Sequence, residues 1–216
     1  MLEHGSSKRP LLLSFDFKAA FPSLKRRWLE LTLAHYGVPQ GMLWAIAALY
    51  HAPIAFARFG DMHLTPMCEL ASGVLQGCPL SGSLWALCMD PLLRHLQRPF
   101  PSLDHGVVRA CADDIGLVMM CVTQLVLIAE TFCFAEKLAG LALQPAKCVA
   151  VPLWAPLSSE VQSQTHSDLV EARGWWGAFQ VSDVVKYLGV WLGPGATAEL
   201  QWKAPIGEVV ETHPSS

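Results

Sequence analysis

The chain has 216 residues, of which 52% are hydrophobic and 15% are charged. This length and apolar content allow a folded domain with a sizeable core, and they exclude a chain that is disordered throughout. The formal net charge of −3 argues against a strongly basic nucleic-acid-binding domain, because such domains carry a positive footprint.

Hydrophobic periodicity divides the first third of the chain into short elements separated by Gly and Pro. The apolar run after Pro10 predicts a buried strand. The segment after it predicts a helix that Ser23 can cap and that Gly37 and Pro39 end. The predicted elements are a strand at 11–17, helices at 22–37 and 41–52, and a strand pair at 54–59 and 62–70.

The rest of the chain begins with a loop at 72–82 that is rich in Gly and Pro. Residues 154–183 are mixed and polar, which predicts a loop or insertion, and residues 194–216 predict a flexible tail. The elements predicted between these segments are a helix at 81–97 with a kink at Pro91, a hairpin at 107–120, a helix at 123–140, a strand at 147–154 and a hairpin at 184–193.

Together the elements predict an α+β fold. Their order is compatible with a ferredoxin-like split βαβ antiparallel sheet packed on helices. In such a sheet the first strand can lie beside the hairpin at 107–120. We therefore expect Asp16, at the end of the first strand, to lie close to Asp113 and Asp114 in the hairpin turn.

Two interpretations are open for these carboxylates. Asp113 and Asp114 are turn formers, and Asp16 can cap the helix that follows it. The alternative is a divalent-metal site, because carboxylate oxygens are the ligands that Mg²⁺ prefers and because a buried charge needs a partner. Two such ions need carboxylates from separate segments to converge on one spot.

The cysteines and the longest charge-free segments bear on the cellular compartment and on a possible membrane span. Seven scattered cysteines without a CxxC pair, together with no secretory signal or other targeting peptide, predict reduced thiols in an intracellular protein. Nucleus and cytoplasm both remain open, as does the oligomeric state. The charge-free segments 31–57 and 115–129 are interrupted or short, whereas a spanning helix needs about 20 apolar residues, so we expect no membrane span.

Five segments, in order, resemble the reverse transcriptases of non-LTR (LINE-like) retrotransposons and group II introns. The first is FDFKAAFPSL at 15–24, and the most specific is GVLQGCPLSGSLWAL at 73–87. CADD at 111–114 is similar to a third motif, which usually has an aromatic residue where Cys111 stands. GLALQPAKCVAV at 140–151 and KYLGVWLG at 186–193 follow in the family's order.

The resemblance implies roles for single residues. Asp16 and Asp113 would be metal ligands, with help from the backbone carbonyl of Phe17, and Asp114 would add charge nearby. Lys147 would be the acid for the leaving pyrophosphate, although a solvated lysine is an equally open interpretation. The remaining implied residues are Phe21 as a sugar gate, alternatively a core residue, and Gln76 and Gly77 as lining of the nucleotide and template pocket.

The implied reaction is transfer of a nucleotide from a dNTP to a primer 3′-OH by two Mg²⁺ or Mn²⁺ ions, with an RNA template and a DNA primer as partners. Lys25, Arg26 and Arg27 form part of a local basic cluster that either contacts nucleic acid or is the solvated face of a helix. A catalytically inactive palm-like remnant that binds RNA or protein is the alternative to an active enzyme.

The resemblance also predicts a domain organisation. Residues 1–153 would form a polymerase palm with partial fingers, 154–183 a loop or insertion, 184–193 a terminal palm hairpin and 194–216 a tail. Only 15 residues precede Asp16 and little follows Gly193, so we expect a truncated palm without a thumb.

Overall fold

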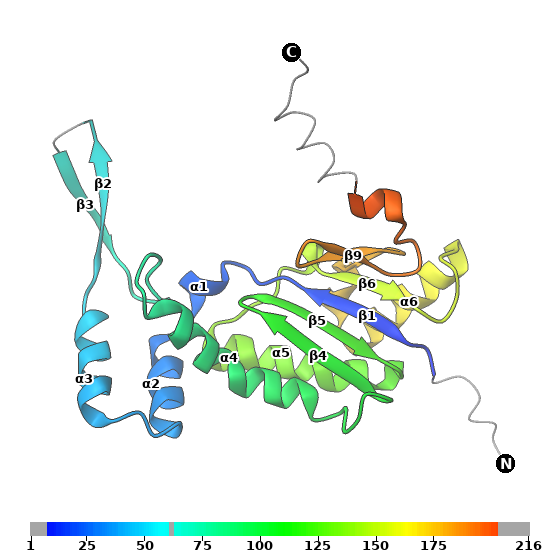
Figure 1. The fold of residues 1–216 in the computed structure, drawn as a ribbon, viewed down its shortest axis with the longest axis horizontal. Helices are drawn as coiled ribbons and strands as arrows, with labels where there is room; N and C mark the ends of the chain where they lie inside the picture. The colour runs from blue at the N-terminus through cyan, green and yellow to red at the C-terminus, as the bar shows by residue number, and fades with distance from the viewer. Residues whose placement is uncertain (1–7, 61–62, 203–216) are drawn as a thin grey trace. The chain divides into compact units, whose positions relative to one another are not determined.

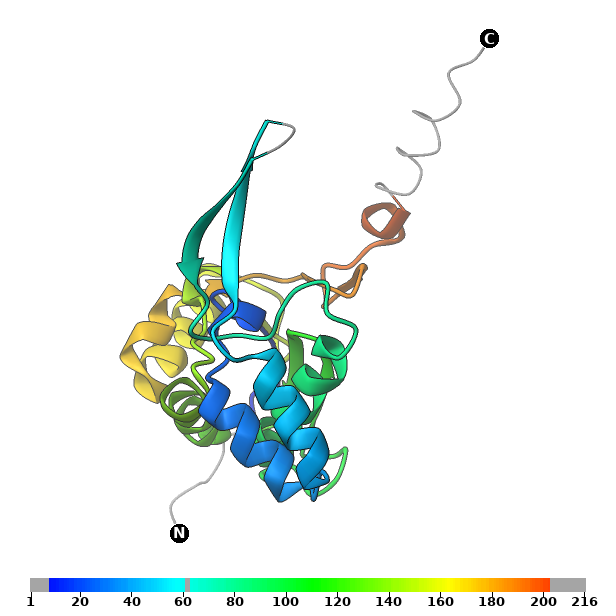
Figure 2. The same cartoon turned by 90° about the vertical axis from the view of Figure 1, so that its left-hand side faces the viewer.

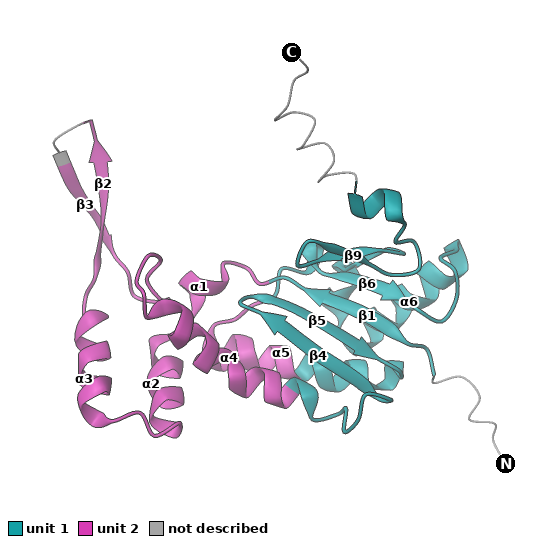
Figure 3. Cartoon of the chain, viewed as in Figure 1, with its two compact units in different colours: residues 1–16, 96–130, 143–216 teal, residues 17–95, 131–142 magenta. Residues whose placement is uncertain are grey.

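The computed structural model describes residues 8–60 and 63–202 of the chain. It divides into two compact units, each built from separate stretches of sequence (Figure 3). Unit 1 comprises residues 1–16, 96–130 and 143–216, and unit 2 comprises residues 17–95 and 131–142. Residues 1–153, predicted as one region, therefore contribute to both units.

Unit 1 is built around a five-stranded sheet in the order β4-β5-β1-β6-β7 (Figure 1). Neighbouring strands are antiparallel except β6 and β7, which are parallel. β5 thus lies between β1 and β4, which places the first strand beside the hairpin. The strands are β1 (Leu11–Phe15), β4 (Gly106–Cys111), β5 (Asp114–Met119), β6 (Val149–Pro152) and β7 (Gln180–Val181).

The central strand β1 is buried on both faces, which explains why its sequence is a continuous apolar run rather than an alternating one. Leu12 packs with Val151 of β6 and with Val185, which belongs to a separate two-stranded sheet. That sheet pairs β8 (Val185–Tyr187) with β9 (Val190–Leu192), so the predicted hairpin at 184–193 is confirmed. It covers one face of the main sheet.

Residues 154–183, predicted as a loop or insertion, contain regular secondary structure rather than a loop. The segment contains α6 (Ser159–Ala172), the 3₁₀ helix η3 (Gly174–Ala178) and β7. Ser158 caps α6 by accepting a hydrogen bond from the Val161 backbone N–H. The buried stripe of α6 consists of Val161, Thr165 and Leu169 only. One of these three is polar, so the helical periodicity is weak in the sequence.

Unit 2 contains most of the helices. α1 (Ala20–Ser23) is short, and α2 (Arg26–His35) and α3 (Gln40–Leu49) lie side by side in both views (Figures 1 and 2). α3 leads into the antiparallel ribbon of β2 (Ile54–Phe59) and β3 (His63–Glu69), which confirms the predicted strand pair. α4 (Ser81–Gln97) carries Pro91 in its interior.

One α-helix and two short 3₁₀ helices complete the list of elements. The 3₁₀ helix η1 (Val122–Gln124) precedes α5 (Leu125–Ala139), and the 3₁₀ helix η2 (Pro145–Lys147) precedes β6.

In the predicted tail, residues 198–202 are helical, and residues 203–216 lie outside the described part of the chain. Within the described residues, no helix combines the length and the apolar character that crossing a membrane requires.

Candidate active site

The pairing of β1 with β5 brings two of the predicted carboxylates to the same end of the sheet. The last paired residues are Phe15 and Ile115, so the next step of the antiparallel register sets Asp16 opposite Asp114. Asp113 lies in the two-residue turn between β4 and β5, next to Ala112, whose φ of 54° is left-handed. The fold thereby gathers residues from two distant parts of the sequence.

The carboxylates influence one another. The pKa of Asp114 is raised above its usual value, first by partial burial and then by the negative charges of Asp113 and Asp16. Like charges that raise a carboxyl pKa favour any cation that binds between them. The three aspartates therefore form one electrostatic group on unit 1.

One carboxylate oxygen of Asp16 lacks a hydrogen-bond donor among the described residues. This atom, Oδ2, is buried. The nearest charged partner is the ammonium of Lys147, whose Nζ atom lies 3.9 Å from Oδ2, too far for a hydrogen bond. Both side chains are partly exposed, at 41% for Asp16 and 61% for Lys147. A surface pair of this kind stabilises little, so it leaves Oδ2 available to a stronger cation.

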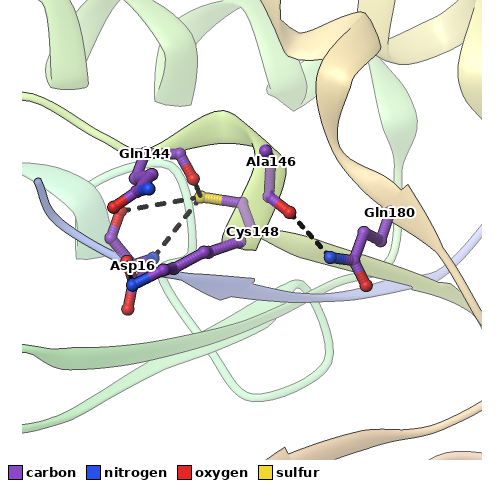
Figure 4. A network of polar contacts seen from close by, with 6 residues as sticks. Asp16, Gln144, Ala146, Cys148 and Gln180 are labelled. Carbon is purple, nitrogen blue, oxygen red and sulfur yellow. Dashed lines mark hydrogen bonds and ion pairs between the residues drawn. The ribbon is translucent and has the colours of Figure 1, made fainter.

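A buried cysteine fastens Asp16 to the segment that carries Lys147 (Figure 4). The Asp16 backbone N–H donates to Cys148 Sγ at 3.4 Å, and the Gln144 N–H donates to the Asp16 carbonyl at 2.8 Å. The thiol in turn lies 3.5 Å from the Gln144 carbonyl oxygen. Burial raises the pKa of Cys148 to about 11, so the thiol stays neutral beside the aspartate.

Asp16, Asp114 and Lys147 line a cavity of about 400 Å³ in unit 1. Its wall contains the carboxylates of Asp16 and Asp114 on one hand and the ammonium groups of Lys147 and Lys186 on the other. Trp191 also lines it, with its ring 6.0 Å from Lys186 Nζ. A cavity with both signs of charge suits a ligand that combines a cation with an anion, such as a metal-bound phosphate.

Two residues that the sequence analysis did not single out belong to this region: Tyr187 lies near Asp114, and Gln180 lines the cavity. Tyr187 of β8 packs over Gly116 of β5, where an added Cβ would lie 3.3 Å from the ring. The pKa of Tyr187 is raised, mainly by burial and then by Cys111 and Asp114. Gln180 of β7 also lines the cavity. The motif containing Tyr187 was visible in the sequence, whereas Gln180 lay in the segment interpreted as a loop.

The carboxylate oxygens of this site are of the type that binds a divalent metal ion. Carboxylate oxygens are hard ligands, and Asp16 Oδ2 is a buried oxygen that lacks a donor. In the described part of the chain, however, no group of three or more His, Cys, Asp or Glu side chains is placed to hold a metal ion. The three aspartates therefore lie as neighbours and do not form a complete ligand cage.

Unit 2 brings together the other predicted nucleotide-site residues. The side chain of Phe21 is half-buried and stacks on Trp85, with ring centroids 4.4 Å apart. The loop that carries Gln76 and Gly77 is fastened to the same place, because the Val74 N–H donates to the Phe21 carbonyl. Gln76 and Gly77 are exposed. Phe17 is buried against Phe132 of α5, at a centroid distance of 6.1 Å.

Lys25, Arg26 and Arg27, at the start of α2, each contact another group inside unit 2. Lys25 Nζ donates to the Lys137 carbonyl at 2.7 Å. The guanidinium of Arg26 donates to the Tyr50 carbonyl at 2.8 Å and also to the Leu70 carbonyl. Arg27 forms a surface ion pair with Glu30. These contacts favour a structural role for the cluster over nucleic-acid binding.

The chain is similar in sequence to a known protein family and to two retrotransposon polyproteins. Residues 3–192 match the family model described as reverse transcriptase (RNA-dependent DNA polymerase). The retrovirus-related Pol polyprotein from the type-2 retrotransposable element R2DM of Drosophila melanogaster is 29% identical over 197 residues, which is 87% of this chain and 18% of the polyprotein. The corresponding polyprotein from the type-1 retrotransposable element R2 of Bradysia coprophila is 32% identical over 184 residues, covering 81% of this chain and 20% of the polyprotein.

Solved structures share the fold. Apo telomerase from Candida tropicalis, truncated from the C-terminal domain, aligns with a TM-score of 0.62 at 11% identity, covering 88% of this chain and 35% of that one. Telomerase from Candida albicans in complex with a fragment of telomeric RNA aligns with a TM-score of 0.51 at 11% identity, covering 86% and 29%. This chain spans at most a fifth of the curated relatives named above. It belongs to the reverse transcriptase family, as a domain of the non-LTR retrotransposon type.

Proposed function

We propose that this chain carries the catalytic centre of an RNA-directed DNA polymerase, which adds dNTPs to a primer 3′-OH on an RNA template. The observation that carries the proposal is the meeting of Asp16 with the hairpin of Asp113 and Asp114 beside Lys147. Family membership alone gives the class of reaction. The arrangement of acidic and basic groups in unit 1 supports the same chemistry in this chain, and the sheet would be the polymerase palm.

Two Mg²⁺ or Mn²⁺ ions, when bound, would activate the primer hydroxyl and neutralise the triphosphate. Asp16 and Asp113 would hold them, together with the backbone carbonyl of Phe17. Asp114, which lines the same cavity as Asp16, would add negative charge nearby in a less direct role. The buried Oδ2 atom of Asp16, which lacks a donor, supports its role as a ligand.

The chain's own groups would do the rest. Lys147 would give a proton to the leaving pyrophosphate, because it lines the same cavity as Asp16 and Asp114. Phe21 would exclude a ribose 2′-OH, and its stack on Trp85 would keep its ring in place. Gln76 and Gly77 would face the nucleotide and template. Lys25, Arg26 and Arg27 would have a smaller part in nucleic-acid binding, because each already makes a hydrogen bond or an ion pair inside unit 2.

Primer extension on an RNA template tests the proposal. The chain should extend a DNA primer with dNTPs only when Mg²⁺ or Mn²⁺ is present, and Asp113→Asn should reduce extension below detection. Asp104→Asn is the matched control, because Asp104 is another exposed aspartate of unit 1 outside the cavity. Extension by the Asp113→Asn variant would overturn the assigned role. RNA binding without extension by the unaltered chain would instead support an inactive palm-like binding module.

A further inference from the structure

We propose that Gln180 is a positioning residue for Lys147, and this inference rests on the proposed function. The Gln180 Nε2 atom donates a hydrogen bond of 2.6 Å to the carbonyl oxygen of Ala146 (Figure 4). Ala146 precedes Lys147 in the 3₁₀ turn η2. Gln180 does not touch the reacting groups through this bond, so it would act by fixing the backbone from which the Lys147 side chain extends.

The backbone of Gln180 is itself firmly placed. β7 pairs with β6 in parallel, and the Gln180 N–H donates to the Cys148 carbonyl at 2.9 Å. The preceding residue, Phe179, is buried and stacks on Trp176 at 4.9 Å. Both rings pack against Phe15, the residue before Asp16. The segment that carries Gln180 is thus anchored to Phe15, the last residue of β1, which directly precedes the candidate metal ligand Asp16.

The turn η2 is held from two sides. On the side of β1, the Gln144 N–H donates to the Asp16 carbonyl, and the Lys147 N–H closes the turn on the Gln144 carbonyl at 2.9 Å. On the side of β7, the Gln180 side chain donates to the Ala146 carbonyl. Lys147 Nζ lies 3.9 Å from Asp16 Oδ2 and is mostly exposed. A long exposed side chain at such a distance keeps its place only if its backbone is fixed.

The test compares single-turnover nucleotide addition at saturating dNTP for the unaltered chain and for Gln180→Met. Methionine has a similar length but no N–H to donate. Because one neutral hydrogen bond is worth a factor of about two to ten, the rate should fall about two- to tenfold, with the KM for dNTP unchanged. Gln162→Ala on the exposed face of α6 is the matched control and should leave the rate unchanged.

A second background separates positioning from a merely structural role. In a chain that also carries Lys147→Met, the Gln180→Met change should have no further effect on the rate, because the group that it positions is gone. Additive losses in the double variant would overturn the proposal, as would an unchanged rate in the single variant. If the unaltered chain extends no primer, the proposed function fails, and amide hydrogen exchange decides this inference separately. Faster exchange at Lys147 and Cys148 in Gln180→Met would support it, and unchanged exchange would overturn it.

Discussion

Replacing Trp176 by Ala should destabilise the protein far more than the same change at its neighbour Trp175. Trp176 is fully buried, and its ring contacts both Phe179 and Phe15. Truncating a buried Trp to Ala costs about 3–5 kcal/mol, out of a typical stability of about 5–15 kcal/mol. With a urea m value of about 2 kcal/mol per molar, the unfolding midpoint should fall by about 1.5–2.5 M.

Trp175 serves as the control within the same turn of η3, because it is 37% exposed and contacts Trp176 only edge-on at 6.0 Å. Its replacement should cost about 1 kcal/mol or less. Urea unfolding followed by far-UV circular dichroism gives both midpoints, and Trp176→Phe provides a milder variant if Trp176→Ala does not fold. Equal midpoint shifts for the two Ala variants would refute the reasoning that residues 174–181 belong to the core of unit 1.

Two further predictions concern the candidate site. Because the folded protein raises the pKa of Asp114, the charged carboxylate opposes folding above that pKa. Asp114→Asn should therefore raise the free energy of unfolding by less than about 1 kcal/mol at pH 7 without divalent ions, and with it the melting temperature. The gain should shrink as the pH falls through the raised value, and a lower melting temperature at pH 7 would contradict it. Phe21→Val should admit ribonucleotides while Phe21→Tyr, which keeps the ring on Trp85, should not; unchanged NTP:dNTP incorporation ratios in Phe21→Val would rule out the gate.

The strand that carries Asp16 was predictable because its signal is local. A short apolar run bounded by Pro10 and followed by a charge has few other interpretations, and two largely apolar segments on either side of paired aspartates mark a hairpin at 107–120. Their adjacency followed from element order alone. What the sequence did not contain was the register that sets Asp16 opposite Asp114, because pairing depends on contacts along both strands.

The failure at 154–183 has a different cause. α6 buries Val161, Thr165 and Leu169, a stripe too narrow and too polar to stand out from its flanks. Gln180 lies in a two-residue strand, which is too short to show the alternation of apolar and polar residues by which a strand is predicted. Its contact with Ala146 depends on the packing of Phe179, which is a property of the folded unit. The sequence likewise did not indicate that Lys25 and Arg26 would donate hydrogen bonds to backbone carbonyl oxygens of unit 2.

The place of the carboxylates follows from the burial of β1. A strand that is covered on both faces cannot carry an unpaired charge along its length, so the first position that can hold one is the residue after its end. Any group packed behind that residue must then add no further negative charge. Cys148 meets this requirement, because its thiol, with a pKa of about 11, stays protonated while its sulfur accepts from the Asp16 N–H. A carboxylate at 148 would add a fourth negative charge to Asp16, Asp113 and Asp114, and the first two of these already raise the pKa of Asp114.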